Sequence, residues 1–155
     1  MVAPILAACG GDAQDTTGGS PAPTMNDTNT IPFAATLRPA MVHLQRSYES
    51  LRESHQAITE VWESLATGKQ VRCGEYPEAL SPESLTAEGE TALEPLAALL
   101  RRAAIEIDQA ASLWKAECLK PRANPSLDVI NRGRLAARAA GDALTEAEGL
   151  LTGIQ

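Results

Sequence analysis

Residues 37–65 read LRPAMVHLQRSYESLRESHQAITEVWESL and place apolar side chains at alternating intervals of four and three, with one histidine among them. The nine positions are Leu37, Met41, Leu44, Tyr48, Leu51, His55, Ile58, Trp62 and Leu65. Residues three and four apart share one face of a helix, so this spacing is typical of a helix packed lengthwise against partner helices. We expect a helix from about Ala35 to Ala66 that ends before Gly68.

Two later segments repeat this helical spacing. Residues 94–119 and residues 126–151 each place apolar side chains three or four positions apart. In the first segment the positions are Leu96, Leu100, Ala103, Ile107, Ala110 or Ala111, Trp114 and Cys118. In the second segment they are Leu127, Ile130, Ala137, Ala140, Leu144, Ala147 and Leu151. Small residues dominate the second set, so we expect the last helix to approach its neighbours closely.

The connections contain residues that start and stop helices. Residues 67–80 have the composition of a loop, and Ser81 followed by Pro82 predicts the start of a short helix near 82–88, with Ser81 as its N-cap. Ser126 is the predicted N-cap of the last helix. The expected fold is therefore all-α, an up-down-up three-helix bundle with a short extra helix in the connection between the first two helices.

The composition fits one globular helical domain and argues against several other classes. The chain has 155 residues, of which 44% are hydrophobic and only 3% aromatic, so Leu, Ile, Val and Ala must build the core. Its formal net charge of −7 at pH 7 argues against a nucleic-acid binder, which normally carries a basic surface. No uninterrupted apolar stretch approaches the ~20 residues that cross a bilayer as a helix.

The N-terminal residues carry a processing signal. Leu6-Ala7-Ala8-Cys9 resembles a bacterial lipobox, the site where a signal peptide is cut and the new N-terminal cysteine is acylated. The resemblance implies that Ala7 and Ala8 fit a peptidase cleft and that the Cys9 thiol takes a lipid. Residues 10–32 follow and are rich in Gly, Ser, Thr, Asn, Asp and Pro, which is the composition of a flexible tether.

These features divide the chain into three regions. We expect residues 1–8 to be a truncated remnant of a signal peptide, because a complete signal has a basic start and a longer apolar run. Residues 9–33 are the expected lipidated cysteine and disordered tether, and residues 34–155 the helical bundle domain. The alternative is a cytosolic protein whose N-terminus contains the four lipobox residues by coincidence.

Two cysteines remain if Cys9 carries lipid. Cys73 and Cys118 are an even pair in an exported chain, which favours a disulfide over the alternative of two free thiols. Their separation provides no C-x-x-C redox motif or zinc knuckle. In an up-down-up bundle the bridge requires that the loop after the first helix fold back along the bundle, or that the helices be staggered.

Few residues are candidates for catalysis or for binding a metal ion or another ligand. His43 and His55 lie about 18 Å apart on one helix and cannot share a metal ion, and no di-iron, haem, nucleophile-elbow or phosphate-loop motif is present. We therefore expect no catalytic residue, no metal site and no cofactor. His55 and Trp62 are candidate ligand contacts, although such residues on an apolar face are more often part of a core.

Charge is unevenly distributed along the chain. Residues 75–94 contain glutamates and no basic residue, whereas residues 115–138 are mainly basic. The basic residues are Lys115, Lys120, Arg122, Arg132, Arg134 and Arg138. In an up-down-up bundle they lie at the same end as the tether, so we expect them to be membrane-proximal, facing anionic headgroups. The alternative is that these charges only complement the helix dipoles.

Together these features predict a non-enzymatic, lipid-anchored helical module in the bacterial cell envelope, outside the cytoplasm. Its expected role is interaction or structural, with the membrane as one partner through the lipid and another envelope protein as a second. The alternative is a ligand- or metal-binding lipoprotein that uses a groove near His55 and Trp62. An apolar pocket between helices would favour that alternative, and a solid core would count against it.

We predict that Cys9 is acylated. Expressed with its upstream codons and supplied with a radiolabelled fatty acid, the wild-type chain should incorporate label, and the Cys9→Ala variant should not. The thiol is the acceptor of the lipid, so its removal leaves no point of attachment. Cys73→Ala is the matched control and should label like wild type. Equal labelling of wild type and Cys9→Ala would contradict the prediction.

Overall fold

The computed structural model describes residues 33–74 and 80–154, all of which belong to one compact unit, residues 31–155. The side chains of residues 39–74 and 80–153 are described. The lipobox, Cys9 and most of the expected tether lie outside the described residues.

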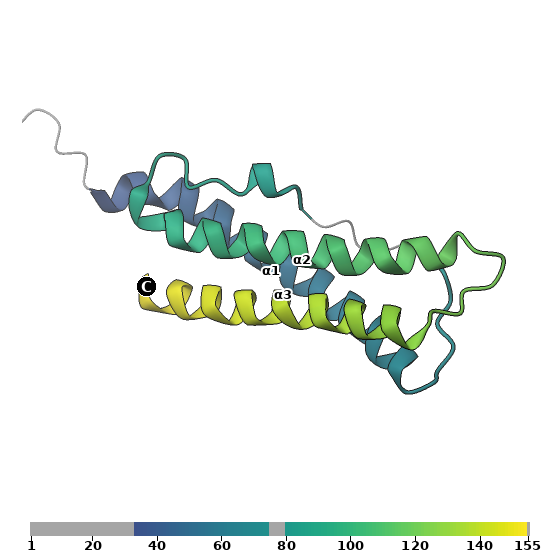
Figure 1. Ribbon diagram of the computed structural model, residues 1–155. Helices are drawn as coiled ribbons and strands as arrows, with labels where there is room; N and C mark the ends of the chain where they lie inside the picture. The colour runs from purple at the N-terminus through teal and green to yellow at the C-terminus, as the bar shows by residue number, and fades with distance from the viewer. Residues whose placement is uncertain (1–32, 75–79, 155) are drawn as a thin grey trace, which may run out of the picture. The chain divides into compact units, whose positions relative to one another are not determined.

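Three long helices pack against one another, which confirms the all-α three-helix bundle (Figure 1). Helix α1 spans Phe33–Ala66, α2 spans Glu94–Cys118 and α3 spans Leu127–Ile154. Two short 3₁₀ helices, η1 at Pro82–Ser84 and η2 at Thr91–Leu93, lie between α1 and α2. Within the described residues there is no strand, and no helix is both long and apolar enough to span a membrane.

The direction of α2 differs from the expected up-down-up order. Trp62 and Trp114, each near the C-terminal end of its helix, have ring centroids 6.1 Å apart. An antiparallel α2 would separate these rings by most of the ~37 Å length of a 25-residue helix. Helices α1 and α2 are therefore parallel, and α3 runs opposite to both (Figure 1). We call the end where α1 and α2 finish and α3 begins the disulfide end.

The connection between α1 and α2 makes the parallel arrangement possible by running back along the bundle (Figure 1). His43 Nε2, in the first half of α1, donates to the Ser84 carbonyl at 3.0 Å, and Arg101 of α2 donates to the Leu85 carbonyl at 2.8 Å. Leu85 is fully buried and anchors the connection on the core. Residues 67–93 are long enough to cross the bundle at ~3.3 Å per extended residue, which a short connection is not.

The observed helix starts match those predicted from the sequence only in part. Ser126 Oγ accepts a hydrogen bond from the Val129 N–H at 3.4 Å, so the predicted N-cap of α3 is confirmed. The predicted helix near 82–88 is only the three-residue η1, and the Ser81 hydroxyl bonds to the Glu83 carboxylate instead of capping a backbone N–H. The chain turns at Glu88 and Gly89, which both have positive φ, so no helix continues there.

The Cys73–Cys118 disulfide is confirmed, with the two Cα atoms 5.6 Å apart. Because α1 and α2 both finish at the disulfide end, Cys73 follows α1 at the place where Cys118 ends α2. The bridge therefore needs neither of the two conditions expected from an up-down-up order, a loop that folds back before Cys73 or staggered helices, because the connection returns along the bundle only after Cys73. In the chain-entropy account, a bridge across 45 residues contributes about 4 kcal/mol to the free energy of unfolding.

The core is built mainly from alanine and leucine, with the two tryptophans at the disulfide end. Leu44, Leu51 and Ile58 of the predicted α1 face are buried, as are all three alanines expected to face inward from α3. Leu127 was expected to face the core but is 72% exposed, because it is the first residue of α3 and precedes the first full turn against α2.

Gly133 lets the backbone of α3 lie against the Trp62 ring of α1. A Cβ atom at this position would lie 2.2 Å from Cε2 of the fully buried Trp62 ring, far inside van der Waals contact. The indole of Trp62 therefore lies directly on the backbone of α3, and only glycine leaves room for it.

Gly133→Ala should lower the free energy of unfolding by about 1–3 kcal/mol, because the added methyl overpacks the Trp62 contact. Gly149→Ala is the matched control on the same helix. Its Cβ would meet nothing within 4 Å, and alanine favours helix, so this change should stabilise by about 0.5–1 kcal/mol. Urea unfolding measures both, and an equal effect of the two substitutions would contradict the proposed contact.

Candidate functional site

A groove of about 380 Å³ lies between α1 and α3. Its lining includes His55 and Trp62, the two candidate ligand contacts predicted from the sequence. The two helices are antiparallel, so residues late in α1 face residues early in α3. This register places Glu63 opposite Arg134 at one end of the groove and Tyr48 opposite Glu148 at the other.

His55 crosses the groove and binds the opposite helix. Its Nε2 lies 2.9 Å from the Ala137 carbonyl oxygen, and a carbonyl only accepts, so Nε2 carries a proton and donates. Gly141 makes room for the ring, since a Cβ there would lie 3.0 Å from Nε2. His55 is half-buried, as expected for a histidine that belongs to the packing between helices. Its Nδ1 is the ring's remaining polar atom.

The floor of the groove holds buried polar atoms. Trp62 is fully buried, and its Nε1–H has no hydrogen-bond partner among the described residues. The same is true of the Thr59 hydroxyl, one turn earlier on α1. Both residues line the groove. Both atoms are closed to solvent, so a molecule in the groove would bond to them only after the neighbouring side chains move.

Charged groups close the two ends of the groove. Arg134 donates to both carboxylate oxygens of Glu63, at 2.8 and 3.1 Å. At the other end, burial raises the pKa of the Tyr48 phenol, the neighbouring Glu148 carboxylate raises it further, and Arg52 opposes the rise. Tyr48 therefore stays protonated as a neutral donor at physiological pH.

Arg138 and Asp142 also line the groove and, like Arg52 and Glu148, form no ion pair among the described side chains. They lie one turn apart on α3, with both side chains exposed. A guanidinium and a carboxylate that do not neutralise each other can bind a molecule with both charges. In the described part of the chain, no three His, Cys, Asp or Glu side chains gather as metal ligands would.

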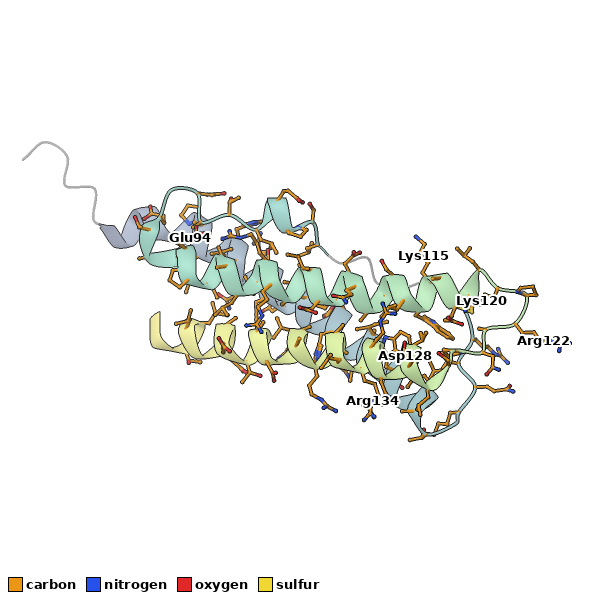
Figure 2. The ribbon with its side chains drawn as sticks, in the orientation of Figure 1. Glu94, Lys115, Lys120, Arg122, Asp128 and Arg134 are labelled. Atoms are coloured by element: carbon orange, nitrogen blue, oxygen red, sulfur yellow. A yellow bond between two sulfur atoms is a disulfide. The ribbon has the colours of Figure 1, made fainter. Side chains whose placement is uncertain are left out.

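The predicted basic residues gather near the disulfide end. Figure 2 shows Lys115, Lys120 and Arg122 where α2 finishes, and Glu94 at the opposite end of the same helix. Arg132 and Arg134 lie on the first turns of α3, and Arg138 lies in the groove.

The structure removes the geometric reason for expecting these basic residues to lie near the membrane. That reason depended on an up-down-up order, which would bring the basic turn to the end where α1 begins. The parallel packing of α1 and α2 puts the turn at the opposite end instead.

Sequence reasoning missed Lys69 and Arg72, which join this basic end from the connection after α1. The bridge holds Arg72, next to Cys73, close to the end of α2. Knowledge that α2 runs parallel to α1 would have placed Lys69 and Arg72 with the other basic residues, because the connection then leaves α1 beside the α2–α3 turn.

Comparison of the chain with protein-family models, with curated proteins and with solved structures finds no match.

His55→Leu should leave the free energy of unfolding unchanged within about 1 kcal/mol or raise it. The Ala137 carbonyl is in the middle of a helix, so loss of the imidazole leaves it bonded within α3, and leucine fills the space without a buried polar atom. Thermal melts of wild type and variant measure this.

Mass spectrometry and elemental analysis of the native preparation test the opposing hypothesis, in which His55 contacts a ligand. A molecule that copurifies at near one equivalent with wild type and is lost in His55→Leu would make His55 a ligand contact instead of a packing residue.

Proposed function

We propose that this protein is a non-enzymatic, lipid-anchored helical module of the bacterial cell envelope that acts by binding another envelope component. The observation that carries the proposal is the Cys73–Cys118 disulfide. Stable disulfides belong to oxidising compartments outside the cytoplasm. The bridge agrees with the lipobox-like Leu6–Cys9 segment and with the polar residues 10–32 that separate it from the bundle.

The bundle itself supports a binding role, because packing and a disulfide together restrain one of its ends. Its core is closed by the Trp62–Trp114 pair, and the bridge ties the connection to the end of α2. Large apolar side chains are nevertheless exposed on its helices, among them Leu119 at the end of α2 and Leu135 on α3. Burial of such side chains against a partner would contribute favourably to the free energy of binding.

The groove between α1 and α3 favours a second candidate function, the binding of a small molecule. Its exposed side chains Arg138 and Asp142 form no ion pair with any described residue, and two buried donors beneath it, the Trp62 Nε1–H and the Thr59 hydroxyl, have no hydrogen-bond partner among the described residues. This chemistry suits a small organic molecule that carries both charges, and it offers no clustered ligands for a metal within the described residues.

Cell fractionation tests the proposed function. The gene, expressed with its upstream codons, should yield a protein that sediments with membranes and is digested by protease added to spheroplasts. A cytosolic marker protein in the same sample should stay intact. Cys9→Ala should leave the membrane fraction, because it lacks the site of acylation.

Thiol labelling completes the test. Cys73 and Cys118 should react with a maleimide only after reduction, both in wild type and in Cys9→Ala. A protein that is found in the cytosol with both thiols free would overturn the proposed function.

A further inference from the structure

We propose that the disulfide end of the bundle is a docking surface for an acidic, partly apolar segment of a partner protein. This inference rests on the proposed function, in which the module binds another envelope component, and it names the chemistry of that partner. The surface is formed by the residues after α1 and by the α2–α3 turn, which the Cys73–Cys118 bridge and the adjoining helices hold side by side.

A groove of about 620 Å³ lies between these two segments. Its polar lining consists of two cations, Lys69 and Arg122, and two amides, Gln70 and Asn124. Its apolar lining consists of Leu65, Val71, Pro125 and Ile130. Among the described residues, no acidic side chain lines it. The chain as a whole has a net charge of −7, so a groove whose only charged lining residues are cations contrasts with the acidic character of the chain.

The cations of this groove are free to bind a ligand. Three other basic residues of the same end are occupied: Lys120 binds the buried Glu117 at 2.6 Å, Arg134 binds Glu63, and Arg132 lies 4.0 Å from Asp128. Lys69 and Arg122, by contrast, are exposed and form no ion pair with any described residue. Carboxylates of a partner are the natural counterions for such a pair of cations.

Exposed leucines border the turn and indicate that the partner also has apolar groups. Leu119, just after α2, is 83% exposed, and Leu127, at the start of α3, is 72% exposed. A polyanion without apolar side chains would leave both leucines in water. An acidic protein segment with interspersed leucines or similar residues would cover them and fill the apolar part of the groove.

The shape of the surface favours a peptide over an anionic bilayer, which also attracts cations and leucines. The Gln70 and Asn124 amides line a concave site and can bond to the backbone of an extended segment, whereas a bilayer is flat. Two prolines, Pro121 and Pro125, and the disulfide restrain the walls. A wall that is already ordered loses little conformational entropy on binding, which favours affinity.

The test uses the purified full-length protein and a fluorescein-labelled peptide of glutamates with interspersed leucines, with binding followed by fluorescence anisotropy. The peptide should bind, and binding should weaken as salt rises. Lys69→Glu/Arg122→Glu should weaken binding by about tenfold or more, because it replaces both cations of the groove with charges of the same sign as the peptide. Leu119→Ser/Leu127→Ser should also weaken it.

A matched control variant, Arg46→Glu/Arg102→Glu, makes the same change in net charge at exposed positions outside this end and should bind like wild type. Circular dichroism confirms the fold of each variant. A peptide of glutamate and serine, and one of lysine and leucine, should bind at least about tenfold more weakly than the glutamate–leucine peptide.

Several results would overturn the inference. The first is that the glutamate–leucine peptide does not bind. The second is that the control variant loses as much peptide affinity as Lys69→Glu/Arg122→Glu does. The third is that the protein binds phosphatidylglycerol vesicles more strongly than the peptide and that Lys69→Glu/Arg122→Glu abolishes this binding. Because the measurement uses purified protein, it is independent of anchoring. If the peptide does not bind but fractionation finds a lipid-anchored protein with its disulfide formed, the docking inference is wrong and the proposed function stands. If the protein is cytosolic with free thiols, the proposed function is wrong whether or not the peptide binds.

Discussion

The contact between Trp62 and the backbone of Gly133 fixes the arrangement of the three helices. The indole leaves no space for a Cβ on α3, so the two helices meet where α3 has a glycine. The edge-to-face contact with Trp114 brings α2 to the same point, and all three helices are thereby joined at one layer of the core. This layer lies next to the disulfide, so packing and a covalent bond restrain the same end.

The register set by this contact also forms the groove. Once Trp62 meets Gly133, an antiparallel helix brings His55 to the Ala137 carbonyl and Tyr48 to the level of Glu148. Small residues on α3 hold the two backbones close and leave space between the larger side chains along the groove. The packing of α1 on α3 and the polar cavity between them therefore have the same origin.

The sequence predicts the helices and the bridge well, because both depend on local spacing and on cysteine count. It does not predict the direction of α2, since an apolar face has the same periodicity whichever way the helix runs. One sequence feature does conflict with an antiparallel α2. In that arrangement the loop after the first helix has to fold back along the bundle before Cys73 can reach Cys118. His55 and Trp62 could be chosen from the face of one helix. Arg138 and Lys69 could not, because each reaches its site only through a particular pairing of helices.

The parallel course of α1 and α2 has a mechanical consequence. The chain enters the bundle at Phe33, and the groove lined by Lys69 and Arg122 lies at the opposite end of α1. A pulling force applied between Phe33 and Arg122 passes along α1 and across the disulfide, so the chain lengthens only if α1 unwinds or slides along its neighbours. The bridge also closes 45 residues into a loop that cannot be drawn out, which removes roughly 150 Å of extended chain from the length that tension can release. Residues 73–118 thus add nothing to the extension of the chain for as long as the bridge is intact.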